Sequence, residues 1–447
     1  MTGQNKIIKI PKSLNFKKFD TQFLPDVNAF LTSLPRDFSE IVFDLTGTTW
    51  MDLLEAACLP IVAEWIEKET DEVCKPRFLF RFPLKFAKGS TEQESNLKKS
   101  NDFYFHFLSW WRVLDILLEF KFKIGGLLGN EKCFSYGEIN DFLKMEDYQI
   151  PPELRDYITW LREERVKESD LRQMGRSSRL LPLTPVHNKN TISVFVSSLK
   201  KRLEKLQWMD KDERGTLCDS IIYELCENII DHAYNPTDAL PKTGLVAVRL
   251  LSDPTGEGEI INRRINAKKI KNLITYRIKS VPERYESFFA SNRYSGFLEI
   301  VVADGGQGFR STLGSLYEQE KKHKATECEI IDYAFSEGVT RRDKQIIPTA
   351  GKSLSLLKRK VMNWGKSREE IPSWGGLLEV RSFDGRITYL PGGAPIPTNN
   401  LPKLPGVQYR IFLPTRTQES QLRRKHQIDD LIGLEKQFPL FSNNNTE

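Results

Sequence analysis

The sequence lacks several patterns that would assign a chain to a familiar class of protein. None of its six cysteines forms a C-x-x-C pair, and none of its five histidines belongs to an H-E-x-x-H motif. A cysteine-based metal site is therefore not expected. No run reaches the ~18 apolar residues needed to cross a bilayer, and the first residues lack the apolar core of a signal peptide. We therefore expect a reduced, cytoplasmic protein without a membrane span.

A complete nucleotide-binding P-loop is also missing. Gly351-Lys352-Ser353 resembles the end of a Walker A loop, yet Ile346 occupies the place of the first glycine. No convincing strand leads into this segment, so a Walker A site is not expected. The chain has a formal charge of +6, but its basic runs are largely without interleaved aromatic residues. Because stacking platforms need such aromatics, nucleic acid is not expected as a partner.

A helical segment around residues 224–234 is the most informative feature that the sequence does contain. At about 100° per residue, Glu224, Asn228 and Asp231 fall on one arc of a helix, opposite an apolar arc. A carboxylate beside a carboxamide suits a base that activates water next to a ligand of Mg²⁺, which prefers oxygen donors. On this segment alone, an ordinary amphipathic helix with a solvent-exposed polar face is the simpler explanation.

A second pattern is a strand that ends in a glycine-rich turn. Residues 296–303 are β-branched and aromatic with a single charge, which is typical of a buried strand. Asp304 follows this strand, and Gly306 and Gly308 lie in the turn after it. Glycines let the backbone approach a ligand closely, and the aspartate can accept a hydrogen bond from an exocyclic amine. A tight hairpin turn is the alternative explanation.

Three further segments complete the C-terminal half. Residues 351–362 predict a helix, and residues 375–382 predict a strand that continues into a hairpin at Asp384-Gly385. Residues 406–414 predict a last strand. Each segment is weak evidence alone, and their order along the chain is strong evidence.

This order resembles the GHKL ATPase superfamily, which includes gyrase-type ATPases, histidine kinases and anti-sigma factor kinases. By this resemblance, Glu224 and Asn228 match the E-x-x-x-N box, in which the glutamate is the general base and the asparagine binds Mg²⁺. Asp304, Gly306 and Gly308 match the D-x-G-x-G box, whose aspartate recognises the adenine amine. The resemblance therefore implies ATP and Mg²⁺ as ligands.

The resemblance covers about residues 195–415 and implies a GHKL (Bergerat) α/β sandwich. Gly351-Lys352-Ser353 falls on the second glycine box, near the triphosphate. Arg341 and Lys344 lie where the family has its mobile ATP lid, so we expect one of them to contact phosphate.

Three departures from the family pattern concern turnover more than binding. Ser353 and Ser355 replace two glycines of the second box, and Val407 replaces a threonine that helps to hold adenine. A basic insertion at 253–293 lengthens the spacing between the first two boxes. ATP binding remains the expectation, and turnover is expected to be slow.

The N-terminal part alternates strands and helices. The pattern predicts strands at 6–11, 40–46 and 77–82, and helices at 52–67 and 101–120. Such alternation implies a small α/β layer.

This part resembles a STAS domain, the fold of anti-anti-sigma factors. The match is carried by Val42-Phe43-Asp44-Leu45-Thr46-Gly47 and the following Trp50-Met51-Asp52-Leu53. Phosphorylatable members have a serine where this chain has Leu53, which has no nucleophile. Thr46, Thr48 and Thr49 lie nearby as possible acceptors, but turn residues at a strand end are their simpler role. We therefore expect this part to bind a protein partner rather than to accept phosphate.

The sequence thus predicts an α/β protein of several domains. We expect a STAS-like domain at 1–125, a helical linker region at 126–190, a GHKL ATP-binding domain at 191–416 and a polar, disordered tail at 417–447. The length of 447 residues and the hydrophobic content of 39% suit this division.

Three function classes follow, in order of preference. The first is a slow Mg²⁺-dependent ATPase that drives a conformational or partner-binding switch. The second is a serine/threonine kinase resembling the anti-sigma factor kinases, and the third is a nucleotide-sensing interaction protein without turnover. Glu224 favours the first two, because a site that only binds needs no base. Leu53 counts against the kinase, because the fused domain lacks the usual acceptor.

Overall fold

In the computed structural model of the protein, the described residues form several long stretches separated by gaps. They are residues 4–33, 38–48, 50–71, 74–80, 141–150, 179–206, 211–233, 244–252, 296–337, 353–365 and 375–415, with the short pieces 116–117, 123–126, 133–134, 155, 158–159, 162, 209, 285, 288–289 and 339. The tail at 417–447 and most of the insertion at 253–293 lie outside them. Within these stretches, no helix is long and apolar enough to cross a membrane.

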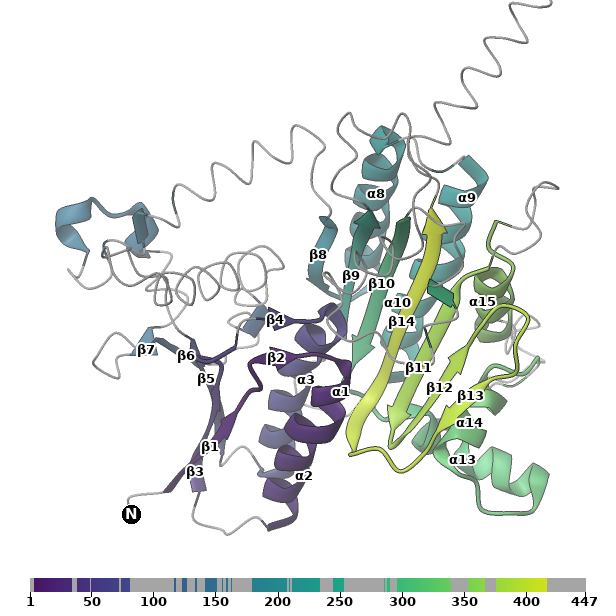
Figure 1. Ribbon diagram of the computed structural model, residues 1–447, viewed down its shortest axis with the longest axis horizontal. Coiled ribbons are helices and arrows are strands. Elements are labelled where there is room, and N and C mark those ends of the chain that lie inside the picture. Colours follow the sequence, from purple (N-terminus) through teal and green to yellow (C-terminus); the bar gives the residue numbers. More distant parts are fainter. Residues whose placement is uncertain are drawn as a thin grey trace, which may run out of the picture.

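The N-terminal part contains a five-stranded mixed sheet with the strand order β1-β3-β5-β6-β7 (Figure 1). Its strands are β1 (Gln4–Lys9), β3 (Phe38–Asp44), β5 (Lys75–Phe80), β6 (Lys123–Gly126) and β7 (Cys133–Phe134). Strands β1, β3, β5 and β6 pair in parallel, and β7 is antiparallel to β6. Parallel neighbours need crossover connections, so the predicted alternation of strands and helices is the natural pattern for this sheet.

The second sheet has seven strands in the order β13-β12-β11-β14-β10-β9-β8, each antiparallel to its neighbours. The strands are β8 (Arg179–Pro185), β9 (Gly244–Ser252), β10 (Gly296–Asp304), β11 (Leu377–Phe383), β12 (Gly385–Tyr389), β13 (Ile396–Thr398) and β14 (Leu404–Thr415). Strand β8 precedes residue 191, where the sequence places the start of this domain. Its prolines lie at the sheet edge, where a missing N–H group is tolerated. The predicted mixed α/β class is confirmed.

Helices cover both faces of the seven-stranded sheet (Figure 1). On the N-terminal side lie α1 (Phe16–Lys18), the π-helical turn η1 (Phe19–Phe23), α2 (Leu24–Ser33) and α3 (Leu53–Glu69). On the other side lie α8 (Lys189–Leu206), α9 (Lys211–Gly215), η4 (Thr216–Ile222), α10 (Tyr223–Asn228), η5 (Ile229–Ala233), α13 (Gly308–Lys321), α14 (Glu327–Ala334) and α15 (Ser353–Met362). The short strands β2 (Ser13–Leu14) and β4 (Trp50–Met51) pair in parallel beside α1.

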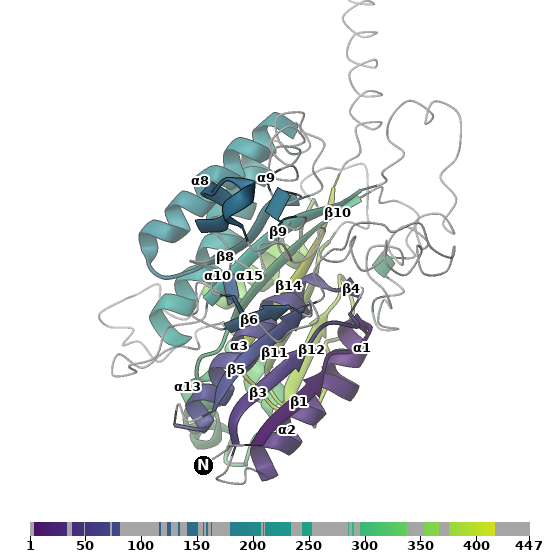
Figure 2. The same ribbon diagram turned by 90° about the vertical axis from the view of Figure 1, so that its left-hand side faces the viewer.

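The alternation of side chains along the strands explains why both faces are covered. Val248 and Ile300 pack into the cluster formed with α8, α10 and the helices after β10. Their neighbours Ala247 and Val301 pack into the cluster formed with α2 and α3. Successive strand residues point to opposite faces, so the sheet has two apolar faces and forms a middle layer. Figure 2 shows the N-terminal strands and helices stacked against it.

Helix α3 lies between the two sheets and is buried nearly all round. Every residue from Leu53 to Ala63 is buried. The helix contacts β5 of the first sheet and β9, β10 and β14 of the second. A helix without a polar face is stable only where neighbours cover it on all sides. Helix α3 therefore joins the two sheets into one body.

The sheet face toward α3 also carries buried charges. These are Arg249, Glu299, Glu379, Arg381, Arg386 and Arg410, each at most 5% exposed. Arg386 Nη1 donates to Asp20 Oδ2 at 2.7 Å, and Arg381 pairs with the same carboxylate. Arg410 Nη2 donates to Glu55 Oε2 at 2.8 Å. Since Asp20 and Glu55 come from η1 and α3, ion pairs as well as apolar contacts join the two parts of the chain.

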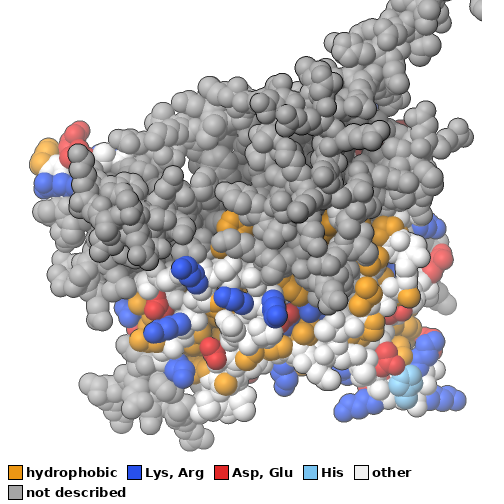
Figure 3. Space-filling model, in the orientation of Figure 1, with side chains coloured by type: hydrophobic (Ala, Val, Ile, Leu, Met, Phe, Trp, Pro, Cys, Tyr) orange, Lys and Arg blue, Asp and Glu red, His pale blue; other side chains and the backbone are white. Residues whose placement is uncertain are grey.

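Basic side chains are not gathered into one patch on the described part of the face in Figure 3. Lys and Arg side chains there are scattered among acidic, hydrophobic and uncharged ones. Some of the basic residues counted in the net charge of +6 are in buried ion pairs instead. Within the described residues of this face, no continuous basic groove of the kind that tracks a nucleic acid backbone is visible.

Candidate functional site

The helix that carries the predicted base and metal ligand has the two-sided character expected from its sequence. Leu225 and Ile229 are buried, whereas Glu224, Asn228 and Asp231 are half-buried. Glu224 lies one turn before Asn228, on the same side of the helix. Helix α10 is short and lies between the π-helical turns η4 and η5. Such turns are frequent at functional sites, because they shift side chains out of the regular helical register.

Asn228 lies next to the start of the second predicted glycine box. Its carboxamide Nδ2 donates to Ser353 Oγ over 3.5 Å, although the two residues are 125 positions apart in the sequence. Ser353 is the first residue of α15. The carboxamide therefore faces a helix N-terminus, where free backbone N–H groups and the helix dipole favour a negative charge. With Nδ2 directed to Ser353, Asn228 Oδ1 is the oxygen that could hold a cation.

Asp304 ends β10 and is held by backbone groups from two directions. Its Oδ1 accepts from the N–H of Gly306 at 2.9 Å and from the N–H of Val407 at 3.2 Å. The residue is only 3% exposed. Burial raises the pKa of Asp304 to about 7, although both backbone donors act to lower it. A carboxylate in this setting is preorganised and poorly solvated, which suits recognition of a hydrogen-bond donor on a ligand.

The end of the Asn228 helix closes onto the Asp304 turn. The carbonyl oxygen of Ala233 accepts from the N–H of Gln307 at 2.8 Å. A Cβ added to Gly306 would lie 2.0 Å from that same oxygen, so only glycine fits at this position. The sequence predicts that Gly306 lets the backbone approach a ligand, whereas in the structure its close neighbour is the backbone of Ala233.

Contacts thus join the predicted segments that carry Asn228, Ser353 and Gly306, and four predicted residues are outside the described part of the chain. Asn228 meets Ser353, and the helix that carries Asn228 meets the Gly306 turn. Gly308 begins α13 on the far side of the turn. Outside the described residues lie Arg341, Lys344, Gly351 and Lys352.

The sequence did not single out the side chains that surround the turn. Ser382 Oγ accepts from the N–H of Phe309 at 3.0 Å, and the same hydroxyl donates to Glu327 Oε1 at 2.6 Å. One signal was available for Glu327. Thr326 and Glu329 form a capping box at the start of α14, and a threonine followed three residues later by a glutamate is a readable helix start. Nothing comparable marks Ser382, which looks like any strand residue.

The donor set fits Mg²⁺ held mainly by a triphosphate. Among the described residues, no group of three or more His, Cys, Asp or Glu side chains could hold a metal ion. Mg²⁺ does not need such a cage, since it often takes one or two protein oxygens and completes its shell with phosphates and water. Asn228 ends α10 and contacts the first residue of α15, so its Oδ1 could supply one protein oxygen to the metal ion.

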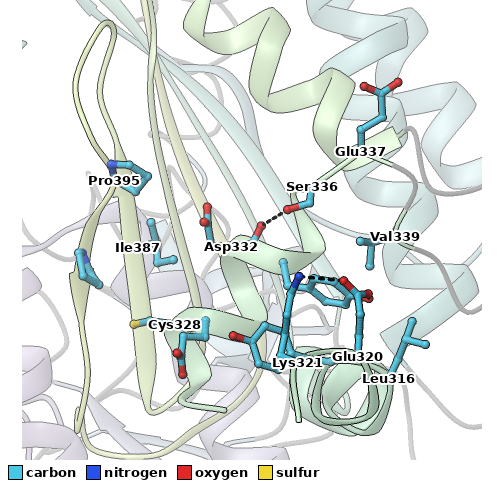
Figure 4. Close-up of a pocket in the computed structure, with 14 residues that line it drawn as sticks. Leu316, Glu320, Lys321, Cys328, Asp332, Ser336, Glu337, Val339, Ile387 and Pro395 are labelled. Atoms are coloured by element: carbon cyan, nitrogen blue, oxygen red, sulfur yellow. Dashed lines mark hydrogen bonds and ion pairs between the residues drawn. The ribbon is translucent and has the colours of Figure 1, made fainter. Parts of the chain in front are cut away.

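A separate groove of about 840 Å³ lies between α13, α14 and the edge of the sheet at β12 and β13 (Figure 4). None of the predicted site residues lines it. Several of its polar groups already bind one another: Tyr333 donates to Glu320 at 2.5 Å, and Asp332 accepts from Tyr389 at 3.0 Å. The groove is therefore distinct from the predicted nucleotide site.

Comparisons with protein-family models, curated proteins and solved structures give no match to this chain.

Proposed function

We propose that the protein binds Mg·ATP in the manner of GHKL ATPases, hydrolyses it slowly and uses it to drive a conformational or partner-binding switch. The observation that carries the proposal is the meeting of three distant segments. Asn228 contacts Ser353, and the end of its helix contacts Gly306 and Gln307. The polar face of an ordinary amphipathic helix would be expected to face solvent instead of the second glycine box.

Asp304, Asn228 and Glu224 each have a distinct role in this proposal. Asp304 accepts a hydrogen bond from the adenine amine, and Asn228 Oδ1 binds the Mg²⁺ that accompanies the triphosphate. Glu224 takes a proton from the attacking water as its oxygen bonds to the γ-phosphorus and the bond to the ADP oxygen breaks. Gly351, Lys352 and Arg341 are expected to contact phosphate. The N-terminal part, which resembles a STAS domain, would transmit the nucleotide state to a protein partner.

Incubation of the purified protein with γ-labelled ATP and Mg²⁺ tests the proposal directly. Slow release of labelled phosphate that is abolished by chelating Mg²⁺ would support the ATPase. Label retained on the protein would support the kinase instead. Nucleotide binding without either outcome would support the sensor, and a lack of binding would refute all three classes.

The kinase alternative is weakened because one nearby acceptor is buried and another has its hydroxyl held in a hydrogen bond. Thr48 is 1% exposed and Leu53 is fully buried. The hydroxyl of Thr46 donates to Asp44 Oδ1 at 2.6 Å. Thr49 lies outside the described residues. A hydroxyl must reach the γ-phosphate to accept it, so Thr46 and Thr48 are poor substrates in this fold.

Asp304→Asn is expected to weaken Mg·ATP binding by about 1–3 kcal/mol. The substitution replaces a charged acceptor with an amide that can present its N–H end to the adenine amine. Isothermal titration calorimetry measures the loss. Asp219→Asn is a suitable control, because Asp219 is exposed and pairs with Lys200 on the outer surface. Equal affinity of the Asp304 variant and the parent would remove the adenine assignment.

The affinity for Mg·ATP is also expected to fall as the pH drops below about 7. Burial raises the pKa of Asp304 to about 7, so the carboxyl group becomes protonated below that pH in the free protein. Binding through the ionised form must then displace a proton, which costs affinity. Calorimetry between about pH 6 and pH 8 should show a steeper profile for the parent than for Asp304→Asn. Titration of the phosphates affects both proteins alike, so parallel profiles would contradict the assignment.

A further inference from the structure

The N-terminus of α13 lacks a cap from its own sequence. The helix begins at Gly308, and the side chain of the preceding Gln307 makes no capping hydrogen bond. The first N–H groups of a helix have no partner within the helix, and a buried N–H group is costly to leave without one. Phe309 is the second residue of α13 and is buried. Its N–H donates to Ser382 Oγ at 3.0 Å, so a side chain from β11 provides the cap.

Ser382 also fits tightly against the end of the turn. Gly308 has φ +71°, a left-handed conformation that favours glycine. A Cβ added to Gly308 would lie 2.9 Å from Ser382 Oγ. The serine hydroxyl thus fills the space that a side chain at Gly308 would take, and it fixes the backbone where the turn becomes a helix.

The Ser382 hydroxyl is itself oriented by a buried carboxylate. It donates to Glu327 Oε1 at 2.6 Å, and Glu327 Oε2 accepts from Arg310 Nε at 2.9 Å. A serine has one hydroxyl proton, so donation to Glu327 directs the oxygen lone pairs toward the N–H of Phe309. Burial raises the pKa of Glu327, and the Ser382 hydroxyl and the Arg310 guanidinium oppose that rise.

Glu327 is held in place by the surrounding backbone. It is the first residue of α14, whose start is fixed by the capping box of Thr326 and Glu329. It is also packed against the β11–β12 hairpin, where a Cβ added to Gly385 would lie 2.6 Å from Glu327 Cβ. The carboxylate therefore connects α14, the hairpin and the N-terminus of α13.

We propose that Ser382, oriented by Glu327 and Arg310, is a positioning residue of the candidate nucleotide site. The Asp304 turn is pinned at one end where Asp304 accepts from Gly306 and Val407, and at the other end where Ser382 caps Phe309. Loss of the second anchor lets the turn relax in the free protein, and ATP must then order it again on binding. This inference rests on the proposed function.

Ser382→Ala tests the proposal, with Thr388→Val as a matched control. Thr388 on β12 is equally buried, and its hydroxyl donates to the buried Glu379 Oε2 at 3.0 Å on the opposite face of the sheet. Both substitutions remove one buried hydroxyl that donates to a carboxylate. The thermal midpoints should fall by similar amounts. Only Ser382→Ala should weaken Mg·ATP binding, by about tenfold, in isothermal titration calorimetry.

A second measurement separates positioning from general loss of stability. Hydrogen exchange of the free protein should become faster in peptides covering residues 304–312 for Ser382→Ala, and should stay unchanged there for Thr388→Val. Glu327→Gln keeps the shape but loses the charge paired with Arg310, and is expected to give an intermediate affinity. If Ser382→Ala does not fold, Glu327→Gln decides the matter, and parent-like affinity then refutes the role.

The two proposals fail in different ways. A parent protein that does not bind Mg·ATP refutes the proposed function, and the positioning role with it. A parent that binds, together with a Ser382→Ala variant that binds equally well, refutes the positioning role alone. Equal loss of affinity in the Ser382 and Thr388 variants refutes it too, because the effect would then follow stability.

Discussion

Arg410→Met is expected to lower the free energy of unfolding by about 3–5 kcal/mol, because it removes one partner of a buried ionic cluster. Arg410 is 1% exposed. Its Nη2 donates to Glu55 Oε2 at 2.8 Å, and its Nε lies 3.2 Å from Glu299 Oε1. Without the guanidinium, Glu55 loses its counter-charge and Glu299 keeps only its pair with Arg249. Urea denaturation of the parent and the variant at neutral pH measures the difference.

The pH dependence of this loss identifies its cause. Burial raises the pKa of Glu55, and Arg410 is the strongest influence that lowers it. In the variant the folded-state pKa rises further above the unfolded value, so the folded protein binds protons more tightly. The destabilisation should therefore be greatest above the folded pKa and should shrink as the pH falls toward the unfolded value.

A surface pair provides the control for Arg410. Lys200 is exposed and pairs with Asp219 at 2.7 Å, so Lys200→Met is expected to change stability little. Because Arg410 and Glu55 lie on β14 and α3, the parent is also expected to unfold in one transition. Separate transitions for the two parts, or equal losses in the Arg410 and Lys200 variants, would contradict the structural role assigned to this cluster.

Glu224→Ala is expected to reduce ATP hydrolysis about 10²–10⁴-fold while leaving Mg·ATP affinity near that of the parent. A base contributes to the step in which water loses its proton, and it contributes little to binding. Phosphate release under single-turnover conditions measures the rate, and calorimetry measures the affinity. Asn228→Ala should instead lose the part of the affinity that depends on Mg²⁺, since it removes the proposed metal ligand.

Glu227→Ala is the matched control on the same helix. Glu227 pairs with Lys189 of α8 at 2.6 Å and is not among the predicted site residues. Its removal should leave both the rate and the affinity near those of the parent. If the Glu224 and Asn228 variants turn over ATP as the parent does, the catalytic assignment is wrong. If no variant or parent turns over ATP but all bind it, the sensor class replaces the ATPase.

The elements around the site could be predicted because their signals are local. The alternation of Glu224, Leu225 and Asn228 around a helix fixes which side is buried, and the structure bears this out. The strand before Asp304 and the helix after Ser353 are likewise encoded in short stretches of apolar periodicity. The contacts between these segments are not encoded locally. Asn228 and Ser353 could be expected to meet only through the family resemblance.

What the sequence by itself determined is a subset of the strands and helices, among them β3, α3, β10 and α15, together with the two arcs of the Asn228 helix and the glycine turn after Asp304. Only the tertiary structure decided which charged strand residues are buried. Arg410 alternates with apolar neighbours, as a residue on a solvent-facing side would, yet it is buried on Glu55, which lies 355 positions earlier. Strand periodicity tells which residues share a face, and it cannot tell whether water or another part of the chain covers that face.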